Sequence, residues 1–299
     1  MIPLIEIKEK AVAEGVPETT VIKDYALSWM LKALNDVSDA FALKGGTGIR
    51  KAYIEGYRFS VDLDFTLTES VDVREVLLEA VRLARRESGI EFGKALGLKS
   101  VRTGYEARVM FRLYYHFPMK IKIDVTTPEN EVIVLPLERR QLIHPYSDKC
   151  DALLLVYSLQ EIFAEKVRSL FERTRPRDLY DVWYLSKIVE LEESVPVIRR
   201  KFEHRGLELR MKRFLERREV FQAAWTPSLE NQLVAVDVSS KRIRRDHDIL
   251  RRKDYSVPLP RLGVEGHRAP DFFPATWIAK MKTYAYRYSS PVLHLNPNP

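Results

Sequence analysis

Strict alternation of apolar and polar residues marks the stretch from Phe59 to Leu67. The apolar positions are Phe59, Val61, Leu63, Phe65 and Leu67, and the polar ones are Ser60, Asp62, Asp64 and Thr66. Side chains of a β-strand alternate between its two faces, so this pattern predicts a strand with one buried and one polar face. Asp62 and Asp64 then point to the same side of that strand.

Other segments show either the same alternation of apolar and polar residues or the spacing of apolar residues that is typical of a helix. Alternation predicts strands over 106–115, 119–125 and 131–135. Apolar residues at helical spacing predict a long helix from Val21 to Phe41, leading directly into a tight glycine turn at Lys44–Thr47, and a second helix over 71–88. Residues 89–104 are predicted to be loop-rich. Helices with a run of strands favour the α+β class, with a mixed, largely antiparallel β-sheet flanked by helices.

After Pro145 the pattern is helical. Helices are predicted over 159–171, from Pro176 to about Val189, and in one or two basic pieces within 195–225. Beyond Lys241 the chain is rich in proline and basic residues. We therefore predict three parts: an α+β domain over 1–145, a helical C-terminal domain over 146–240 that completes an active-site cleft, and a basic, proline-rich extension over 241–299.

Composition is that of a globular protein, with 45% hydrophobic and 30% charged residues in 299. The sequence contains no apolar run of membrane-spanning length and no signal-peptide pattern at its start, so we expect no membrane association. The single cysteine, Cys150, fits a reducing compartment, and we expect a cytoplasmic protein.

The net charge of +7 is unevenly placed. Residues 241–299 hold 12 Lys and Arg against 5 Asp and Glu, whereas residues 1–240 hold 37 of each. A basic tail is suited to neutralising nucleic-acid phosphates, but it is equally typical of a solvated extension.

The pair Asp62 and Asp64 is the strongest candidate for chemistry. Two carboxylates on one strand face suit a divalent cation, which prefers oxygen ligands. Solvated acids on an edge strand are the alternative, although aspartate is disfavoured in strands. Asp124, in the strand 119–125, supplies a third carboxylate, and as an ordinary strand-end acid it needs no function.

Lys166 lies on the inward stripe of its helix, four residues from both Ile162 and Leu170, so it either extends out to solvent or enters a polar site. Asp178 and Asp181 share a face of the next helix, where Asp178 also suits the positive helix N-terminus. Thr47, Arg58 and Ser60 are placed either for phosphate contacts or for ordinary structural ones.

Two blocks, LKGGT…RFSVDLDF at 43–65 and EIFAEKVRSLFERTRPRDLYDVWYL at 161–185, resemble the AbiEii/AbiGii toxin family of nucleotidyltransferases. These are the toxin halves of abortive-infection, type IV toxin–antitoxin pairs. The resemblance implies a nucleotidyltransferase-like fold, with Mg²⁺ (or Mn²⁺) held by Asp62, Asp64 and Asp124 against a nucleoside triphosphate. It implies catalytic roles for Asp62, Asp64, Asp124, Lys166 and Asp181, and nucleotide binding by Lys44, Gly45, Gly46, Thr47, Arg58, Ser60, Lys166 and Asp178.

By the same resemblance the reaction is transfer of a nucleoside monophosphate from NTP to an acceptor hydroxyl, with RNA such as a tRNA 3′ end as acceptor. A cognate antitoxin, a DNA-binding protein encoded nearby, is the implied partner. Two alternatives remain open: a small molecule or a protein as the acceptor, or a non-catalytic nucleic-acid-binding protein that uses the basic tail. If the enzyme interpretation holds, Asp62, Asp64, Lys166 and Asp181 should line one cleft.

Overall fold

The computed structural model describes residues 1–208, 210, 212, 214 and 216–234. Its strands are β1 (Phe41–Lys44), β2 (Asp62–Leu67), β3 (Glu91–Val101), β4 (Gly104–Arg112), β5 (Met119–Thr126), β6 (Glu138–Gln141) and β7 (Leu153–Val156). Its α-helices are α1 (Leu4–Glu14), α2 (Glu18–Val37), α3 (Gly45–Gly48), α4 (Val73–Ser88), α5 (Leu159–Glu172), α6 (Pro176–Leu185), α7 (Leu191–His204) and α9 (Arg218–Leu229). A π-helical turn, η1 (Ile49–Tyr53), and a 3₁₀ turn, η2 (Pro128–Asn130), complete the described elements.

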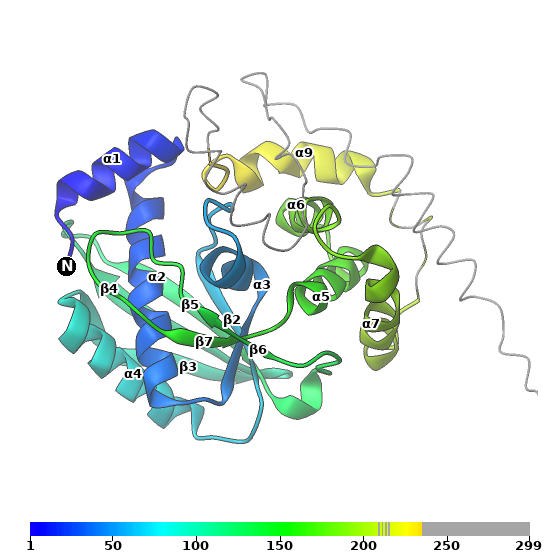
Figure 1. Ribbon diagram of the computed structural model, residues 1–299, viewed down its shortest axis with the longest axis horizontal. Coiled ribbons are helices and arrows are strands. Elements are labelled where there is room, and N and C mark those ends of the chain that lie inside the picture. The colour runs from blue at the N-terminus through cyan, green and yellow to red at the C-terminus, as the bar shows by residue number, and fades with distance from the viewer. Residues whose placement is uncertain (209, 211, 213, 215, 235–299) are drawn as a thin grey trace, which may run out of the picture.

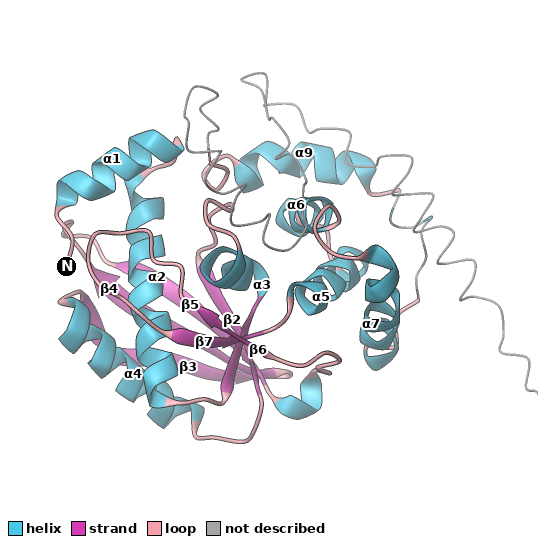
Figure 2. Ribbon diagram, viewed as in Figure 1, coloured by secondary structure: helices cyan, strands magenta, loops and turns pink. Residues whose placement is uncertain are grey.

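The seven strands form one sheet in the order β3-β4-β5-β2-β1-β7-β6. Strand β2 runs parallel to β5, and β1 runs parallel to β7, while the other four pairings are antiparallel. Helices lie on both sides of these strands (Figure 2). The predicted α+β class with a mixed, largely antiparallel sheet is therefore confirmed.

Two apolar cores lie on opposite faces of the sheet. The first packs α1, α2 and α4 against alternate residues of the strands, such as Leu43, Phe65 and Ile123. The second gathers α5, α6, α7 and α9 around Ala42 and Tyr157. Adjacent residues Ala42 and Leu43 enter different cores, as strand alternation requires. Figure 1 shows the resulting arrangement, with α1, α2 and α4 to the left and the later helices grouped to the right.

The order of elements around the glycines differs from the prediction. Helix α2 ends at Val37, and strand β1 follows it before the glycines. Every residue of β1 is buried, so this central strand reads as a short apolar run, which periodicity alone cannot distinguish from a helix. The glycines themselves begin α3 rather than forming a tight turn, and β2 begins only at Asp62.

Three other predicted segments were also wrong. Residues 91–101 form the edge strand β3, whose exposed face and glycines hide the alternation. Residues 131–135 form no strand, because the backbone N–H groups of Val134 and Leu135 donate to the Glu161 carboxylate of α5 instead. Strand β7 interrupts the stretch predicted to be wholly helical, and the predicted domain boundary at 145 falls between β6 and β7 of the same sheet.

The predicted division into domains over 1–145 and 146–240 remains a prediction. The two cores meet at the end of β7, where Val156 belongs to the first and Tyr157 to the second. The extension predicted at 241–299 lies outside the described residues.

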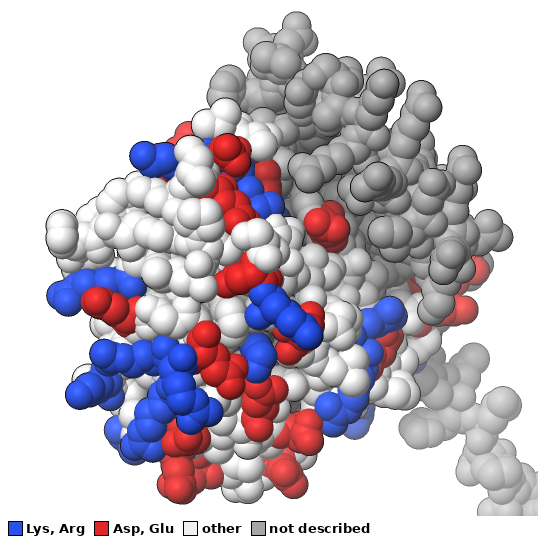
Figure 3. Space-filling view, turned by 60° about the vertical axis from the view of Figure 1, so that its left-hand side comes forward, with Lys and Arg blue, Asp and Glu red and all other residues white. Residues whose placement is uncertain are grey.

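Acidic and basic side chains both lie on the surface of the described chain. Basic and acidic side chains are interspersed on the face seen in Figure 3, in keeping with the equal numbers in residues 1–240. None of the helices that the structure describes has the length and apolar character needed to cross a membrane.

Candidate functional site

The candidate site is built on three adjacent strands at the centre of the sheet. Asp64 of β2 lies directly opposite Lys44 of β1 on one side and Asp124 of β5 on the other. Asp62 lies opposite Lys122 of β5. Residues directly opposite one another share a sheet face, so the three carboxylates and both lysines project to the same side. This is the side on which the second core and helix α5 lie.

Asp64 is the most perturbed carboxylate of this group. Its burial raises the pKa, and the nearby charges of Asp124 and Asp62 raise it further, while Lys166 and Lys44 oppose the shift. The net result is a raised pKa, so the ionised form of Asp64 is held in an unfavourable environment. Crowded carboxylates with a raised pKa are a common feature of sites that receive a cation.

The glycine segment packs directly on this group. Gly45 has a left-handed φ of +69°, and a Cβ there would lie 2.6 Å from Asp64 Oδ2. A Cβ on Gly46 would lie 2.7 Å from Arg58 Nη2 and 3.1 Å from Ser60 Oγ. The two glycines are therefore required for close packing against the side chains of β2 and the segment before it, as well as for any approach of a phosphate.

The rest of α3 and the π-helical turn η1 are held by polar contacts to β2 and to α2. The Thr47 hydroxyl donates to the backbone carbonyl of Asp62. Arg50 Nε and Lys51 Nζ contact the two oxygens of the buried Asp24 of α2 at 2.8 and 2.6 Å. Burial alone would raise the pKa of Asp24, but the two cations hold it well below its usual range. Thr47 thus has a structural hydrogen bond, and the segment is rigidly attached to the first core.

Lys166 of α5 lies between two acids of α6. Its Nζ is 2.9 Å from Asp178 Oδ1 and 2.8 Å from Asp181 Oδ2. Burial would lower the pKa of Lys166, but these carboxylates outweigh that effect and raise it, so the ammonium is charged. Of the two alternatives left open for Lys166, the structure thus has the polar site, and the charge of Lys166 also acts on Asp64.

Asp181 is completely buried. The prediction that it lines one cleft with Asp62, Asp64 and Lys166 is therefore wrong for Asp181. Arg58 binds both of its oxygens, with Nε and Nη2 each at 2.6 Å, and the Tyr57 hydroxyl donates at 2.7 Å. Lys166 is the third partner residue and makes the fourth contact, so the acceptor positions of Asp181 are occupied. Burial would raise the pKa of Asp181, but Arg58 and Lys166 hold it below its usual value. Asp181 is therefore placed to position Arg58 and Lys166.

Sequence reasoning missed Arg173, at the end of α5. It contacts Asp178 Oδ2 at 2.8 Å, so Asp178 holds Arg173 as well as Lys166. Burial would lower the pKa of Arg173, but Asp178 and, to a smaller extent, Asp64 raise it. The side chain is 44% exposed, which makes it the most accessible cation of this group. Its position at a helix C-terminus gives a basic residue an ordinary structural explanation, which hid it in the sequence.

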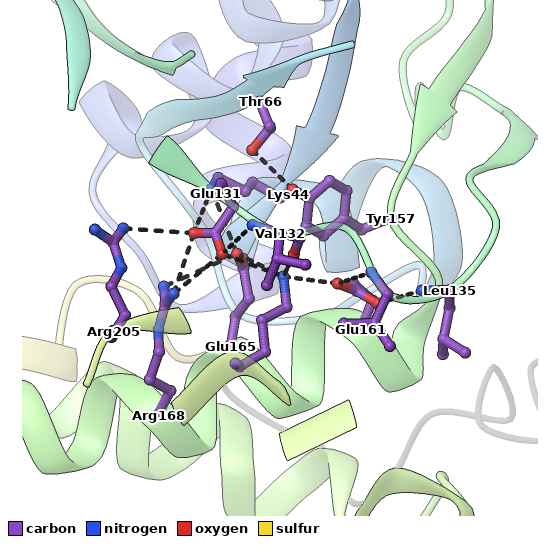
Figure 4. Close-up of polar contacts among 12 residues, drawn as sticks. Lys44, Thr66, Glu131, Val132, Leu135, Tyr157, Glu161, Glu165, Arg168 and Arg205 are labelled. Carbon is purple, nitrogen blue, oxygen red and sulfur yellow. Dashed lines mark hydrogen bonds and ion pairs between the residues drawn. The ribbon is translucent and has the colours of Figure 1, made fainter. Parts of the chain in front are cut away.

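A second ionic group, drawn in Figure 4, includes Lys44, which also lies opposite Asp64 in the first group. Lys44 Nζ is 3.4 Å from Glu165 Oε1 and 3.7 Å from Glu131 Oε2. Lys201 Nζ, fully buried, contacts Glu161 at 2.6 Å and both other glutamates at 3.4 Å. We call this group, completed by Arg168 and Arg205, the glutamate cluster. It ties β1 and the segment after β5 to α5 and α7.

The three strand carboxylates have the donor chemistry that a divalent cation requires. Within the described part of the chain, no three His, Cys, Asp or Glu side chains are gathered closely enough to form a ready metal site. Asp124 Oδ2 instead contacts Lys122 Nζ at 2.6 Å. Asp62 and Asp124 repel the ionised Asp64 and raise its pKa, and a bound cation would relieve this repulsion. The three carboxylates are oxygen ligands on one face of adjacent strands, which suits Mg²⁺ or Mn²⁺.

The structure thus brings most of the predicted residues into one region. Asp62, Asp64, Asp124, Lys44, Gly45 and Gly46 meet on the strands and α3, and the charge of Lys166 reaches Asp64. Arg58, Asp178 and Asp181 form the buried layer that supports Lys166, while Ser60 is buried beside Gly46.

This combination of a mixed sheet, a glycine segment and strand carboxylates defines a nucleotidyltransferase. The family model for "Nucleotidyl transferase AbiEii toxin, Type IV TA system" matches residues 29–248. The chain therefore belongs to the AbiEii family, and it is a nucleotidyltransferase toxin of a type IV toxin–antitoxin system. The resemblance found in the sequence is confirmed. No curated protein matches the chain.

Three solved structures are similar to the chain, and the first of them supports the fold. MenT4, the nucleotidyltransferase toxin Rv2826c from Mycobacterium tuberculosis H37Rv, matches with a TM-score of 0.56 and 17% identity, over 96% of this chain and 99% of that one. JHP933 from Helicobacter pylori matches with a TM-score of 0.44 and 17% identity, over 71% and 79% of the two chains. A putative nucleotidyltransferase from H. pylori matches with a TM-score of 0.45 and 17% identity, over 91% and 95%.

Proposed function

We propose that this toxin transfers a nucleoside monophosphate from a nucleoside triphosphate to a hydroxyl of RNA, such as a tRNA 3′ end, in a reaction that depends on Mg²⁺ or Mn²⁺. One observation carries the proposal. Asp64 lies in register between Lys44 and Asp124, next to Asp62, and within the electrostatic reach of Lys166. The site therefore combines crowded carboxylates for a cation with lysines for phosphates.

Asp62, Asp64 and Asp124 would hold the cation. When bound, it would neutralise charge on the triphosphate and on the departing pyrophosphate. The mutual repulsion of the carboxylates gives this face of the sheet a preference for positive charge. Asp124 would exchange its contact with Lys122 for the cation.

Two lysines and one arginine would contact the triphosphate. Lys44 and Lys166 approach Asp64 from opposite elements, β1 and α5, and each is held by buried carboxylates. Arg173 is the accessible cation at the edge of the group. Lysine suits the phosphate as a compact charge, and arginine as a donor of two parallel hydrogen bonds. The N–H groups of α3 after Gly45 add further donors for phosphate oxygens.

The proposed reaction is an in-line displacement at the α-phosphorus. A bond forms between the acceptor hydroxyl oxygen and the α-phosphorus, and the bond from that phosphorus to the bridging oxygen of pyrophosphate breaks. The hydroxyl proton passes to Asp124, whose side chain is 39% exposed. Asp181 takes no direct part; it fixes Lys166 and Arg58 in position.

A cognate antitoxin is the partner that the type IV family implies. We propose that it is a DNA-binding protein encoded next to the toxin.

The test uses one NTP labelled at either the α- or the γ-phosphate. Purified toxin, Mg²⁺ and total RNA are incubated, and label in RNA is measured. Transfer from the α-labelled NTP alone, with release of pyrophosphate, is expected. Periodate oxidation of the RNA before the reaction should abolish transfer, because it destroys the 3′-terminal hydroxyls.

The two alternative acceptors give different products. Label in a small molecule or in protein, with none in RNA, would overturn the RNA acceptor while preserving nucleotide transfer. An absence of label in any product, with each of the four NTPs and with either metal, would overturn the enzymatic proposal.

A further inference from the structure

The strands β3, β4 and β5 carry an excess of positive charge. The segment 91–126 contains seven Lys and Arg against three Asp and Glu, a net charge of +4. Residues 1–240 as a whole contain 37 of each sign. The three-stranded segment is therefore more basic than the average of residues 1–240.

The basic side chains project from the face of the strands that lies away from the first core. In β4, Ala107, Val109 and Phe111 are buried, whereas Arg108 and Arg112 alternate with them and are exposed. Lys120 of β5 is also exposed. The side chains of Lys99 and Arg108 are 60% and 56% exposed. We call the surface formed by Lys99, Arg108, Arg112, Lys120 and Lys122 the basic strand face.

The basic strand face is continuous with the candidate site. Lys122 lies directly opposite Asp62 on one side and Arg108 on the other. Neighbouring strands are about 4.8 Å apart, and alternate residues along a strand about 6.6 Å apart. Arg108 is therefore only two strands from Asp62, and Lys120 lies one step further along β5. The same side of the sheet changes from acidic to basic within a few residues.

The acids of the segment do not cancel this charge. Glu106 contacts Lys99 at 3.2 Å, Arg108 at 3.1 Å and Lys122 at 3.8 Å, so one carboxylate is shared by three cations. Asp124 belongs to the proposed cation site, and Glu91 lies opposite Arg112 at the far end of β4. Met110, 39% exposed, lies between Arg108 and Arg112 along the strand. A flat array of cations with an apolar side chain among them suits a single strand of nucleic acid, whose phosphates and bases alternate.

We propose that the basic strand face binds the phosphates of a single-stranded RNA and leads its terminal hydroxyl to Asp62 and Asp64. The proposal rests on the RNA acceptor of the proposed function and assigns the surface that holds it. Charge complementarity and continuity with the carboxylates support RNA as the occupant. The face binds without regard to base, because phosphate contacts carry no sequence information.

A triple variant tests the surface without altering the site: Arg108→Gln, Arg112→Gln and Lys120→Gln. Binding of a 5′-fluorescein-labelled single-stranded RNA to the full chain is measured by anisotropy over a range of salt, without NTP. Loss of three phosphate contacts should reduce the slope of log K against log [salt] by about 2, and weaken binding roughly tenfold to a hundredfold near 0.1 M salt. The KM for RNA should rise, while the KM for NTP should not change.

The matched control removes three arginines from α4, on the opposite face: Arg74→Gln, Arg82→Gln and Arg86→Gln, all exposed. It should bind RNA within about twofold of wild type, since these residues make no phosphate contact in the proposal. The proposal would be overturned if the triple variant of the basic strand face bound RNA with wild-type affinity and salt slope. It would also be overturned if the α4 control lost as much RNA affinity as that variant. Failure of the proposed function appears separately, as the absence of label transfer by wild type, because anisotropy needs no catalysis.

Discussion

Asp181 and Arg58 form a bidentate ion pair, with both nitrogen–oxygen distances at 2.6 Å and both side chains almost fully buried. The pair joins α6 to the segment before β2, which are more than a hundred residues apart in the sequence. Lys166 shares the same carboxylate. One buried acid thus fixes both the residue that packs on Gly46 and the lysine whose charge acts on Asp64.

Removal of the Asp181 charge should therefore affect stability and activity together. Asp181→Asn leaves Arg58 and Lys166 buried with incomplete compensation, and we expect a loss of about 3 kcal/mol in the free energy of unfolding. Nucleotide transfer should fall at least tenfold, because Lys166 loses one of its two anchors. Urea unfolding and initial rates measure the two effects. Wild-type stability with wild-type transfer would contradict the positioning role.

The contact between Gly45 and Asp64 can be tested with a matched glycine. Gly45→Ala introduces a Cβ 2.6 Å from Asp64 Oδ2 at a φ of +69°. Gly56→Ala carries the same left-handed strain at +74°, but no atom lies within 4 Å of the new Cβ. Gly56→Ala should lose about 1 kcal/mol of stability from backbone strain alone, and Gly45→Ala should lose more because its Cβ also displaces Asp64. Only Gly45→Ala should lose transfer activity, and equal activity in the two would show that the position of Asp64 is unimportant.

The raised pKa of Asp64 predicts a specific dependence of stability on pH. A carboxyl whose pKa is higher in the folded state than in the unfolded state favours folding when it is protonated. Stability from this group is present below the unfolded pKa of about 3.9 and is lost as the pH rises through the folded pKa. Asp64→Asn should therefore be more stable than wild type at pH 7, and the difference should vanish at about pH 3.9.

Added Mg²⁺ should reduce the difference in stability between Asp64→Asn and wild type at pH 7. Mg²⁺ stabilises the folded wild type by binding to it, and it binds more weakly to Asp64→Asn. Thermal unfolding at several pH values, with and without Mg²⁺, measures both effects. A variant that is less stable than wild type at pH 7 without metal would refute the electrostatic account of Asp64.

The glutamate cluster predicts a large loss of stability from a single lysine. Lys201→Met removes the fully buried cation that contacts Glu131, Glu161 and Glu165. Since breaking a buried ion pair leaves charge uncompensated, we expect a loss of about 3–5 kcal/mol. Lys149→Met, at a lysine whose side chain is 88% exposed, should change stability by less than about 0.5 kcal/mol. A small loss in Lys201→Met would show that Lys201 is not needed to compensate the three buried glutamates.

The sequence predicted the parts of the site that are encoded locally. Alternation placed Asp62 and Asp64 on one strand face, and helical spacing placed Lys166 on an inward stripe. The pairings that complete the site depend on contacts between distant segments, so no local period reports them. Arg58 with Asp181 and Lys44 with Glu165 are separated by more than a hundred residues.

Helix α5 is a second case in which local periodicity does not report contacts with distant segments. Helical spacing places Glu161, Glu165 and Arg168 away from the inward stripe of Ile162, Lys166 and Leu170, yet all three are buried. Charged residues are usually exposed, so the sequence predicts that these three face solvent. In the structure they are buried because the glutamate cluster provides partners of opposite charge. A helix packed between a sheet and other helices has no solvated face for amphipathicity to reveal.

The most direct test of the proposed function compares initial rates of transfer from α-labelled NTP to RNA for wild type, Asp62→Asn, Asp64→Asn and the surface control Asp151→Asn. Both strand variants should lose at least a thousandfold in rate at saturating Mg²⁺, because each removes a proposed ligand of the cation. Asp151→Asn, whose side chain is 62% exposed, should match wild type. Transfer at the wild-type rate by Asp62→Asn and Asp64→Asn would contradict the account.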